Sequence, residues 1–336
     1  MQVGGFITSL EDPSLQPLVP HLIDLLLESS AANTVQKYSN GWQKWKAWSQ
    51  SKLAIPVLPA IPLQVALYLT ELGNLAVREG HSVSVIESAS YSIRWGHRLA
   101  GMESPTGHPL VRGVVERALR KLARPVQPKQ PLLYDVIANI TLSLSTASAS
   151  LADICFLFLL LVGYAGIFRI SEILDIRVKD VAIFDDFMKI NLLKRKNDQY
   201  RDGHVSVLAR SRKPTCPVGI TEKLFSLLPD SKGSSYPVVR RIVKSKFSKE
   251  RLHESLGISY FTAYSNFRSY ITPFVSDSRL YGTHSIRIGG ANDPGFRSLD
   301  SALKDRHVGW KNPKSKFRYL EAVPDDLVQI TRAMNV

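Results

Sequence analysis

Apolar side chains recur every three or four residues through most of the first third of the chain, which is the spacing of one face of an α-helix. The first predicted helix begins at Asn33 or Thr34, because either side chain can cap the free N–H groups of a first turn. A second helix is predicted to begin at Pro62 and to carry apolar residues up to Leu72, and two more are predicted over about 84–99 and 109–122. The pattern is therefore that of a helical domain.

Three tryptophans, Trp42, Trp45 and Trp48, lie three residues apart in the first of these helices. Aromatic rings that stack on bases are a common way of binding single-stranded nucleic acid. The spacing of three instead places the rings along one helix face. We therefore interpret the three tryptophans as core residues.

A proline-rich segment interrupts the helical pattern at residues 124–131, where three of the eight residues are proline. Proline has no backbone N–H and disrupts both helices and central strands, so we predict a linker here. Residues 1–123 then form a helical N-terminal domain, and residues 132–336 form a second domain.

The second domain begins with further helices, among them a very apolar one that ends near Phe168. Apolar and polar residues then alternate over 187–208, on both sides of a polar segment at 197–203, which predicts a β-hairpin with a long turn. Helical patterns resume beyond the hairpin and continue to the end of the chain. The predicted fold is mainly α, with a small β-hairpin or sheet in an α+β second domain.

The charge of the chain favours a polyanionic partner. Among its 336 residues, Lys and Arg number 43 against 29 Asp and Glu, which gives a formal net charge of +14. Such an excess favours nucleic acid or an anionic membrane surface. Basic residues of the second domain cluster at 189–213, 240–251 and 304–318. Three such clusters in one domain favour nucleic acid.

Other classes of protein are excluded by composition. The most apolar uncharged run, 154–168, has 15 residues, whereas spanning a bilayer takes about 20. The sequence opens with no secretion signal, so we expect an intracellular protein, located in the nucleus if the source is a eukaryote. Two cysteines are too few for a disulfide framework or a Cys-based zinc site.

Residues suited to attack on a phosphodiester occur along the second domain. A phosphodiester is anionic, and its transition state gathers more negative charge on the non-bridging oxygens, so two permanently charged guanidinium groups fit a clamp. Glu172 lies one helical turn after the first of these arginines, where we expect it to orient that arginine or a histidine. The candidate catalytic residues are Arg169, Lys196, His284, Arg287, Trp310 and Tyr319.

Each of these residue types has a role in such a reaction. Tyr319 is the candidate nucleophile, giving a covalent phosphotyrosine, with His284 as its base or hydrogen-bond partner. Lys196 is the candidate donor of a proton to the departing 5′ oxygen, and the indole N–H of Trp310 can supply one more hydrogen bond. No cluster of carboxylates suited to magnesium stands out, so we expect neither a metal nor another cofactor.

Two segments resemble the arginine boxes of the tyrosine recombinase (phage integrase-like) family. Residues 168–180 are similar to the first box, and residues 284–291 match the second, with its His-x-x-Arg pattern. The likeness is greatest to the Cre-like branch, because Trp310 stands nine residues before Tyr319, where most members carry a histidine. The resemblance implies the catalytic set above and a helical core-binding domain that clamps DNA. The motif pattern further resembles the recombinases of DIRS-like and Crypton-like eukaryotic mobile elements.

Some features depart from the family pattern or leave rivals open. Pro and Gly within residues 292–298 fall where members usually continue a helix, so the path of the chain after the second box is open. His307 is a rival for the position of Trp310, and Lys194 is a rival for Lys196. We interpret three other tyrosines as helix core residues: Tyr264, Tyr270 and Tyr281.

The expected partner is double-stranded DNA. Several basic residues of the predicted N-terminal helices either face the DNA or belong to a solvated surface. These are Lys44, Arg94, His97, Arg98, Arg120 and Lys121. The resemblance further implies a protein that is monomeric when free and a homotetramer on DNA. The candidate linking segment is 325–334, in which Leu327, Ile330 and Met334 form a narrow apolar stripe.

The sequence thus favours a site-specific DNA recombinase that cleaves and rejoins DNA through a 3′-phosphotyrosine. Two alternatives stay open. One is a type IB topoisomerase-like enzyme, which would use the same groups to relax supercoiled DNA. The other is a domesticated DNA-binding protein that has lost activity, which the irregular segment 292–298 leaves open. The helical N-terminal domain and the tryptophan position favour the recombinase over the topoisomerase, and the full catalytic set argues against an inactive protein.

Overall fold

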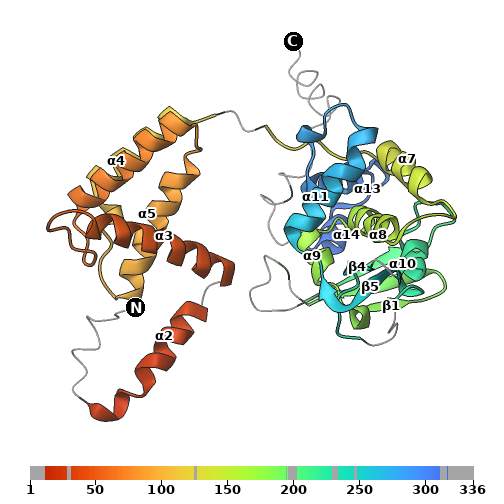
Figure 1. Ribbon diagram of the computed structural model, residues 1–336, viewed down its shortest axis with the longest axis horizontal. Coiled ribbons are helices and arrows are strands. Elements are labelled where there is room, and N and C mark those ends of the chain that lie inside the picture. The colour runs from red at the N-terminus through yellow and green to blue at the C-terminus, as the bar shows by residue number, and fades with distance from the viewer. Residues whose placement is uncertain are drawn as a thin grey trace. The chain divides into compact units, whose positions relative to one another are not determined.

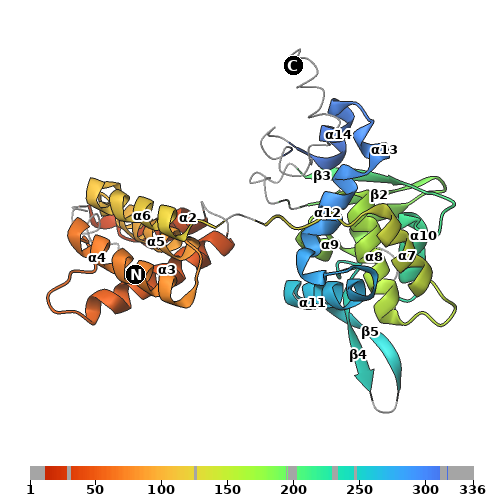
Figure 2. The same cartoon turned by 90° about the horizontal axis from the view of Figure 1, so that it is seen from above.

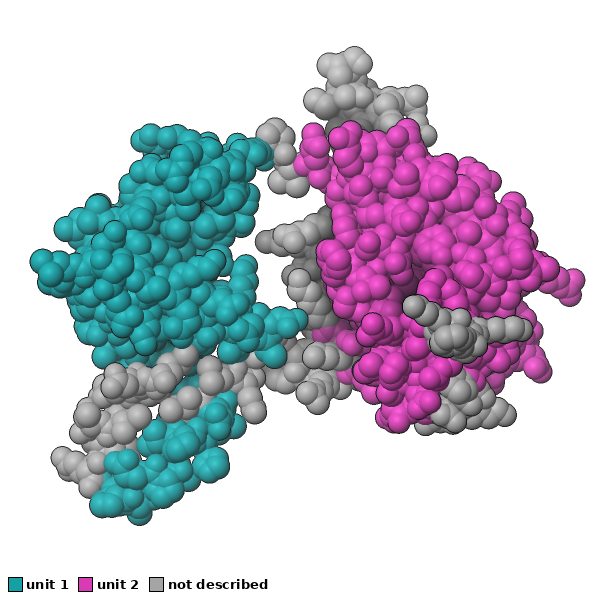
Figure 3. Space-filling model, viewed as in Figure 1, with its two compact units in different colours: residues 1–126 teal, residues 127–336 magenta. Residues whose placement is uncertain are grey.

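The computed structural model describes residues 12–28, 32–124, 127–193, 195, 203–228, 234–245, 248–310 and 316. The chain divides into two compact units, residues 1–126 and 127–336 (Figure 3). The division falls within the proline-rich segment 124–131.

Unit 1 is helical (Figure 1). The four helices predicted from the sequence are present, and a further helix that precedes them, Leu18–Glu28, was not predicted. In chain order the elements are η1 (Pro13–Leu15), α2 (Leu18–Glu28), α3 (Ala32–Gln50), α4 (Pro62–Glu79), α5 (Ser84–Leu99), η2 (Pro105–Gly107) and α6 (Pro109–Leu122).

Helices α3 and α5 approach closely because small residues lie where they meet. A Cβ atom added to Gly96 on α5 would fall 2.3 Å from the ring of Trp42, and one added to Gly41 on α3 would fall 2.2 Å from the hydroxyl of Ser92. The indole of Trp42 therefore lies against bare backbone, an arrangement that any larger residue at position 96 would prevent.

The three tryptophans of α3 belong to the core of unit 1, as their spacing predicts. Trp42 is 7% exposed and Trp45 is fully buried, while Trp48 packs at the edge of the same cluster. The indole N–H of Trp45 donates to the carbonyl oxygen of Val57 at 3.0 Å, and that of Trp48 donates to Glu71 at 2.8 Å. Buried rings with satisfied N–H groups are structural.

His97 corrects one expectation of the sequence analysis, because it is fully buried and does not belong to the exposed basic surface of α5. Its Nδ1 donates to the carbonyl oxygen of Ile93 at 2.8 Å, and its Nε2 accepts from the backbone N–H of Ala60 at 3.0 Å. A neutral imidazole ring satisfies both contacts, because one of its nitrogens donates and the other accepts. Burial lowers the pKa of His97, in keeping with that neutral state.

We predict that unit 1 loses stability as the pH falls below about 6.5, the usual pKa of histidine. Because the pKa of folded His97 is lowered, the unfolded chain binds the proton more readily, so the contribution of His97 is complete above that pH and is lost below it. Thermal unfolding followed by tryptophan fluorescence measures this, since four of the five tryptophans lie in unit 1. The His97→Gln variant should be less stable at pH 7.5 and should vary less between pH 7.5 and 5. An equal pH dependence in both proteins would contradict the assignment.

Unit 2 is also mainly helical, with two small antiparallel sheets of strand order β1-β2-β3 and β4-β5 (Figures 1 and 2). The predicted hairpin is present as β2 and β3. The helices are α7 (Tyr134–Leu144), α8 (Leu151–Ala165), α9 (Ile170–Asp175), α10 (Pro217–Phe225), α11 (Tyr260–Ile271), α12 (Thr283–Asn292), α13 (Pro294–Arg297) and α14 (Ser301–Val308). The strands and short turns of 3₁₀-helix are η3 (Val178–Asp180), β1 (Val181–Ile183), β2 (Phe187–Leu192), β3 (His204–Ala209), β4 (Arg240–Ser245), β5 (Ser248–Gly257), η4 (Thr272–Phe274) and η5 (Ser278–Leu280).

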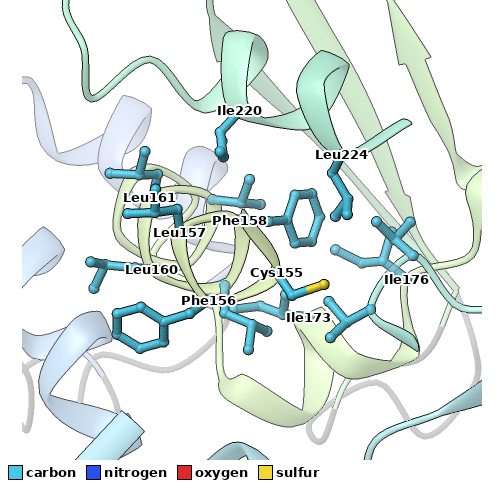
Figure 4. Packing of buried hydrophobic residues seen from close by; sticks show 14 of the residues in the cluster. Cys155, Phe156, Leu157, Phe158, Leu160, Leu161, Ile173, Ile176, Ile220 and Leu224 are labelled. Atoms are coloured by element: carbon cyan, nitrogen blue, oxygen red, sulfur yellow. The ribbon is translucent and has the colours of Figure 1, made fainter. Parts of the chain in front are cut away.

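The apolar helix α8 runs through the middle of unit 2, and every residue from 154 to 163 is buried. Figure 4 shows α8 along its axis, with Ile220 and Leu224 of α10 on one side and Ile173 and Ile176 on another. Ser150 and Asp153 begin the helix with a reciprocal capping box. Among the described residues, no helix combines the length and the apolar character needed to cross a membrane.

Two expectations about this unit are wrong in detail. Helix α8 ends at Ala165 instead of near Phe168, because Gly166 leaves the helix and Ile167 has a φ of +51°. The segment after the first hairpin is not helical throughout, since β4 and β5 form a second hairpin that projects from the unit (Figure 2). These strands are rich in Arg, Lys, Ser and Glu, and only Leu252 among their described side chains is a buried apolar one. Their sequence therefore lacks the apolar alternation that reveals a half-buried strand.

Candidate active site

The start of α9 places the first arginine and its carboxylate together. Glu172 bends back so that its Oε2 accepts from the backbone N–H of Arg169 at 2.8 Å, while its Oε1 accepts from Arg169 Nη1 at 2.7 Å. The carboxylate thus caps the helix and orients the guanidinium at once. Arg169 retains donors beyond this bond, because a guanidinium carries five N–H groups, and its side chain is 17% exposed.

Three guanidinium groups surround the Glu172 carboxylate, which is 3% exposed. Besides Arg169, Arg195 Nε lies 3.3 Å from Oε1, and Arg287 Nη1 lies 3.7 Å from Oε2. Burial by itself would raise the pKa of Glu172, but the charges of the three arginines, with the N–H of Arg169, outweigh it and lower that pKa. The carboxylate is therefore ionised, and the expectation that it orients Arg169 agrees with these contacts.

The second arginine reaches this carboxylate because α12 lies against the backbone of neighbouring segments. A Cβ on Gly289 would fall 2.0 Å from the carbonyl oxygen of Leu132, and one on Gly290 would fall 2.3 Å from that of Tyr164. Arg287 is 1% exposed, and its Nη1 also donates to the carbonyl oxygen of Ile167. His284, one turn earlier on α12, is exposed.

The irregular segment 292–298 has a defined structure. Asp293 ends α12 and caps the short helix α13, accepting from the N–H groups of Gly295 and Phe296 through Oδ1. Its Oδ2 accepts from the hydroxyl of Tyr164 on α8 at 2.8 Å. The break in the helix is therefore tied to the core of the unit, and the chain continues through α14.

Trp310 lies two residues after the last residue of α14. Gly309, whose φ is +68°, separates the two, and the ring of Trp310 meets that of Phe296 edge-on at 6.3 Å between centroids. This pair packs against a small cluster that contains Ile167 and Val308. The turn at 292–298 thus supports the tryptophan through Phe296.

The rival His307 lies three residues earlier, on α14. Its Nε2 donates to the carbonyl oxygen of Ala165 at 2.9 Å, at the end of α8. Its own carbonyl oxygen accepts from Nε2 of His204, the first residue of β3, at 3.1 Å. Burial, followed by the charge of Arg195, lowers the pKa of His204.

Two residues of this cluster, Arg195 and His204, were missed by the sequence analysis. Arg195 is 9% exposed and connects Glu172 to the carbonyl oxygen of Val308, which accepts from its Nη2 at 2.7 Å. The sequence signal for Arg195 is hidden between two lysines, Lys194 and Lys196, in a segment that reads as a solvated turn. His204 gave no signal, because a single histidine at a strand start is common.

Several candidate residues lie outside the described part of the chain. They are Lys194, Lys196, Tyr319 and the segment 325–334. The three tyrosines interpreted as core residues are described: Tyr270 of α11 stacks on Phe156 with ring centroids 4.2 Å apart, Tyr264 is half-buried on the same helix, and Tyr281 packs on the core beyond it. Tyr281 lies outside any helix. Among the described residues, no three His, Cys, Asp or Glu side chains gather as for a metal ion.

The candidate DNA-binding cations of unit 1, apart from His97, are all exposed. They are Lys44 on α3, Arg94 and Arg98 on α5, and Arg120 and Lys121 on α6. Two of them have neighbours within the unit, since Arg94 donates to the hydroxyl of Thr106 at 3.1 Å and Arg120 pairs with Glu116 at 2.7 Å.

Comparisons with known proteins agree with this architecture, although no family model matches the chain. An "Integrase/recombinase xerD homolog" of Selenomonas ruminantium is 23% identical over 297 residues, which cover 88% of this chain and 83% of the relative. A crystal structure of XerH site-specific recombinase, bound to a palindromic difH substrate in a post-cleavage complex, has a TM-score of 0.57 at 12% identity and covers 90% of this chain and 79% of that chain.

Two integrase structures are similar to a comparable degree. A lambda integrase(75-356) dimer bound to a COC' core site has a TM-score of 0.55 at 12% identity, with 91% of this chain and 95% of that chain covered. The Tn1549 transposon integrase in complex with transposon right end DNA has a TM-score of 0.54 at 9% identity, with 89% and 93% covered. The chain thus has the fold of the tyrosine recombinases, and the predicted mainly helical fold class is confirmed. The sequence match likewise supports the tyrosine recombinase/integrase family.

We predict that Glu172→Gln lowers the free energy of unfolding of unit 2 by roughly 3–5 kcal/mol, because removing one partner of a buried ion pair leaves the other charges uncompensated. Glu222→Gln is the matched control. Glu222 pairs with Arg210 at 2.7 Å but is 44% exposed, so its loss should cost about 1 kcal/mol or less. Denaturant unfolding followed by far-ultraviolet circular dichroism compares the two variants. Equal effects would show that the arginines do not depend on Glu172.

Proposed function

We propose that this protein is a site-specific DNA recombinase of the integrase type, which cleaves and rejoins DNA through a covalent 3′-phosphotyrosine. The observation that carries the proposal is the cluster at Glu172, which holds Arg169 and Arg287 side by side at the end of α8. Two fixed guanidinium groups on one carboxylate suit a phosphodiester, because they stabilise charge that develops on its non-bridging oxygens. The sequence relative, itself an integrase/recombinase homolog, supports the same activity.

The proposed reaction conserves the energy of the broken bond. The hydroxyl oxygen of Tyr319 attacks phosphorus, and the bond from phosphorus to the 5′ oxygen breaks as the new bond forms. His284 accepts the tyrosine proton or hydrogen-bonds the phosphate, and Lys196 donates a proton to the departing oxygen. The indole N–H of Trp310 supplies a further hydrogen bond to the phosphate. A 5′-hydroxyl then attacks the phosphotyrosine, the reverse of the first step, and rejoins the strand.

The same chemistry would serve a type IB topoisomerase. The DNA product distinguishes the two enzymes, since a recombinase exchanges strands whereas a topoisomerase relaxes supercoils. The structures similar over most of this chain are those of recombinases and integrases, which favours strand exchange. The alternative of an inactive DNA-binding protein rested on the irregular segment 292–298. The capping of α13 by Asp293 and the packing of Phe296 on Trp310 favour the active enzyme.

A finer placement rests on Trp310 and on the sequence motifs. Trp310 at nine residues before Tyr319 favours the Cre-like branch, and the motif pattern favours a mobile element of the DIRS-like or Crypton-like kind. In a eukaryote such an enzyme acts in the nucleus. A crystal structure of the covalent complex would test the branch, since it shows whether Trp310 or His307 contacts the phosphate.

Assembly on DNA is proposed to be tetrameric, because recombination joins two duplexes through four cleavages. A lambda integrase tetramer bound to a Holliday junction is among the similar structures, with a TM-score of 0.53. In this chain the proposed link between protomers is the segment 325–334, and the free protein is proposed to be a monomer. Sedimentation of the protein alone and with DNA measures both states, and a monomer on recombining DNA would exclude the proposal.

The test of the activity itself is the covalent adduct. We expect the purified protein, incubated with a pool of random DNA sequences, to form an adduct that survives denaturing electrophoresis. Tyr319→Phe removes only the nucleophilic oxygen, so DNA binding should persist while the adduct disappears. Tyr281→Phe is the matched control and should still form it. An adduct undiminished in Tyr319→Phe would assign the nucleophile to another residue.

A role of unit 1 in holding DNA predicts a change in salt dependence. Each phosphate contact contributes about 0.9 to the slope of log affinity against log salt, so Arg98→Ala and Lys121→Ala should each reduce the slope by about that amount. Arg78→Ala, an exposed cation on α4, is the control and should leave the slope unchanged. DNA binding titrated at several salt concentrations gives the slopes. Identical slopes for all three variants would mean that α5 and α6 do not contact phosphates.

A further inference from the structure

We propose that Arg195 is a positioning residue, which fixes the β2–β3 hairpin against Glu172 and α14 and thereby places the proton donor Lys196. The inference rests on the proposed function. Arg195 lies just beyond the end of β2, and its side chain is 8% exposed. A buried guanidinium needs partners for its charge and its N–H groups, so its contacts define where this end of the hairpin can lie.

One guanidinium joins three segments that are far apart in the sequence. Arg195 Nε donates to Glu172 Oε1 at 3.3 Å, and Nη2 donates to the carbonyl oxygen of Val308 at 2.7 Å. Glu172 is the same carboxylate that holds the two arginines proposed to clamp phosphate. Val308 is the last residue of α14, two residues before Trp310. Arg195 therefore holds this end of the hairpin against both Glu172 and the end of α14.

The end of α14 is built to accept such a contact. The last carbonyl groups of a helix have no N–H partner within it and carry partial negative charge, so a cation is favourable there. The hairpin supplies a second donor, since His204 at the start of β3 donates to the carbonyl oxygen of His307 at 3.1 Å. Two adjacent carbonyls of α14 are thus bonded by Arg195, beyond the end of β2, and by His204, at the start of β3.

Gly309 makes room for the guanidinium. A Cβ atom on Gly309 would lie 2.0 Å from Arg195 Nη1, and the φ of +68° is itself one that L side chains rarely adopt. A larger residue at 309 would displace the side chain of Arg195. The glycine just before Trp310 therefore leaves the space that the guanidinium of Arg195 occupies.

The consequence concerns Lys196, which follows Arg195 directly in the sequence. Successive Cα atoms are about 3.8 Å apart, so an anchored Arg195 limits how far the next residue can lie from Glu172. A long lysine side chain otherwise samples many rotamers, and its proton reaches the leaving oxygen only in a few of them. Anchoring the preceding residue raises the share of productive arrangements, which is how a positioning residue acts.

The test separates placement of the acid from the rest of the reaction by changing the leaving group. The substrate is the DNA sequence that the protein recovers as a covalent adduct, made with either oxygen or sulfur at the scissile 5′ position. The rate of adduct formation by each full-length variant is measured on both substrates, because a sulfur leaving group needs little protonation. Arg195→Ala should slow adduct formation on the oxygen substrate by roughly 10²-fold, the size expected for a small misplacement. On the sulfur substrate the slowing should be less than about tenfold.

Three further variants sharpen this test. Arg195→Lys keeps the charge but cannot bridge two acceptors, so it should behave like Arg195→Ala. Gly309→Ala should show the same dependence on the leaving group through displacement of Arg195. Arg279→Ala, which breaks an exposed pair with Asp277, is the control and should match the unchanged protein on both substrates. Adding Arg195→Ala to Lys196→Ala should cause little further slowing, because two residues that act as one unit are not additive.

Equal slowing of Arg195→Ala on both substrates would overturn the inference, as would full additivity with Lys196→Ala. If Arg195→Ala does not fold, Arg195→Lys and Gly309→Ala decide by the same criterion. If the wild-type protein forms no adduct on any DNA, the proposed function is refuted instead. If the wild-type protein is active and the substitutions at 195 and 309 leave its rate of adduct formation unchanged, only the role of Arg195 is refuted.

Discussion

The carboxylate of Glu172, held among three guanidinium groups, is the interaction on which the rest of the site depends. An unpartnered carboxylate at 3% exposure would be protonated, and three unpartnered guanidinium groups would repel one another. Together they lower the pKa of Glu172 and fix Arg169, Arg195 and Arg287 around one point. These side chains come from the start of α9, the segment just beyond β2 and the middle of α12. Their geometry is therefore a property of the folded unit and of no single segment.

Close backbone packing is what brings those segments within reach of one carboxylate. Gly163 on α8 faces Ile173 and Ile286, with less than 3 Å between its missing Cβ and the first of them. Gly289 and Gly290 do the same for α12 against the backbone at Leu132 and Tyr164. A larger residue at Gly163 or Gly290 would move α12 away from α8, and one at Gly289 would move α12 away from the segment at Leu132. The reach of Arg287 to Glu172 then depends on glycines that take no part in chemistry.

The sequence predicted those features that have a local period or a local motif. Helices α3 to α6 of unit 1 follow from apolar spacing, as does the buried face of Trp42 and Trp45, and the β2–β3 hairpin follows from alternation. The β4–β5 hairpin was missed because its strands are charged, so their period carries no apolar signal. Burial of His97 and Arg195 was missed for another reason. Each is buried by partners distant in sequence, Ala60 in one case and Val308 in the other, which no local pattern contains.

The charge balance of the cluster bears on what it can bind. Among the described residues, the cluster itself has three positive guanidinium groups and one negative carboxylate, and Arg169 is the most exposed of the three arginines. A phosphodiester in its ground state carries one negative charge, whereas a pentacoordinate transition state places a second on the non-bridging oxygens. The excess around Glu172 is thus matched more closely to the transition state than to the ground state. Differential stabilisation of that kind lowers a barrier, while equal binding of both states would not. Under the proposed function, the arrangement that holds the fold together at Glu172 is also the one that stabilises the transition state of cleavage.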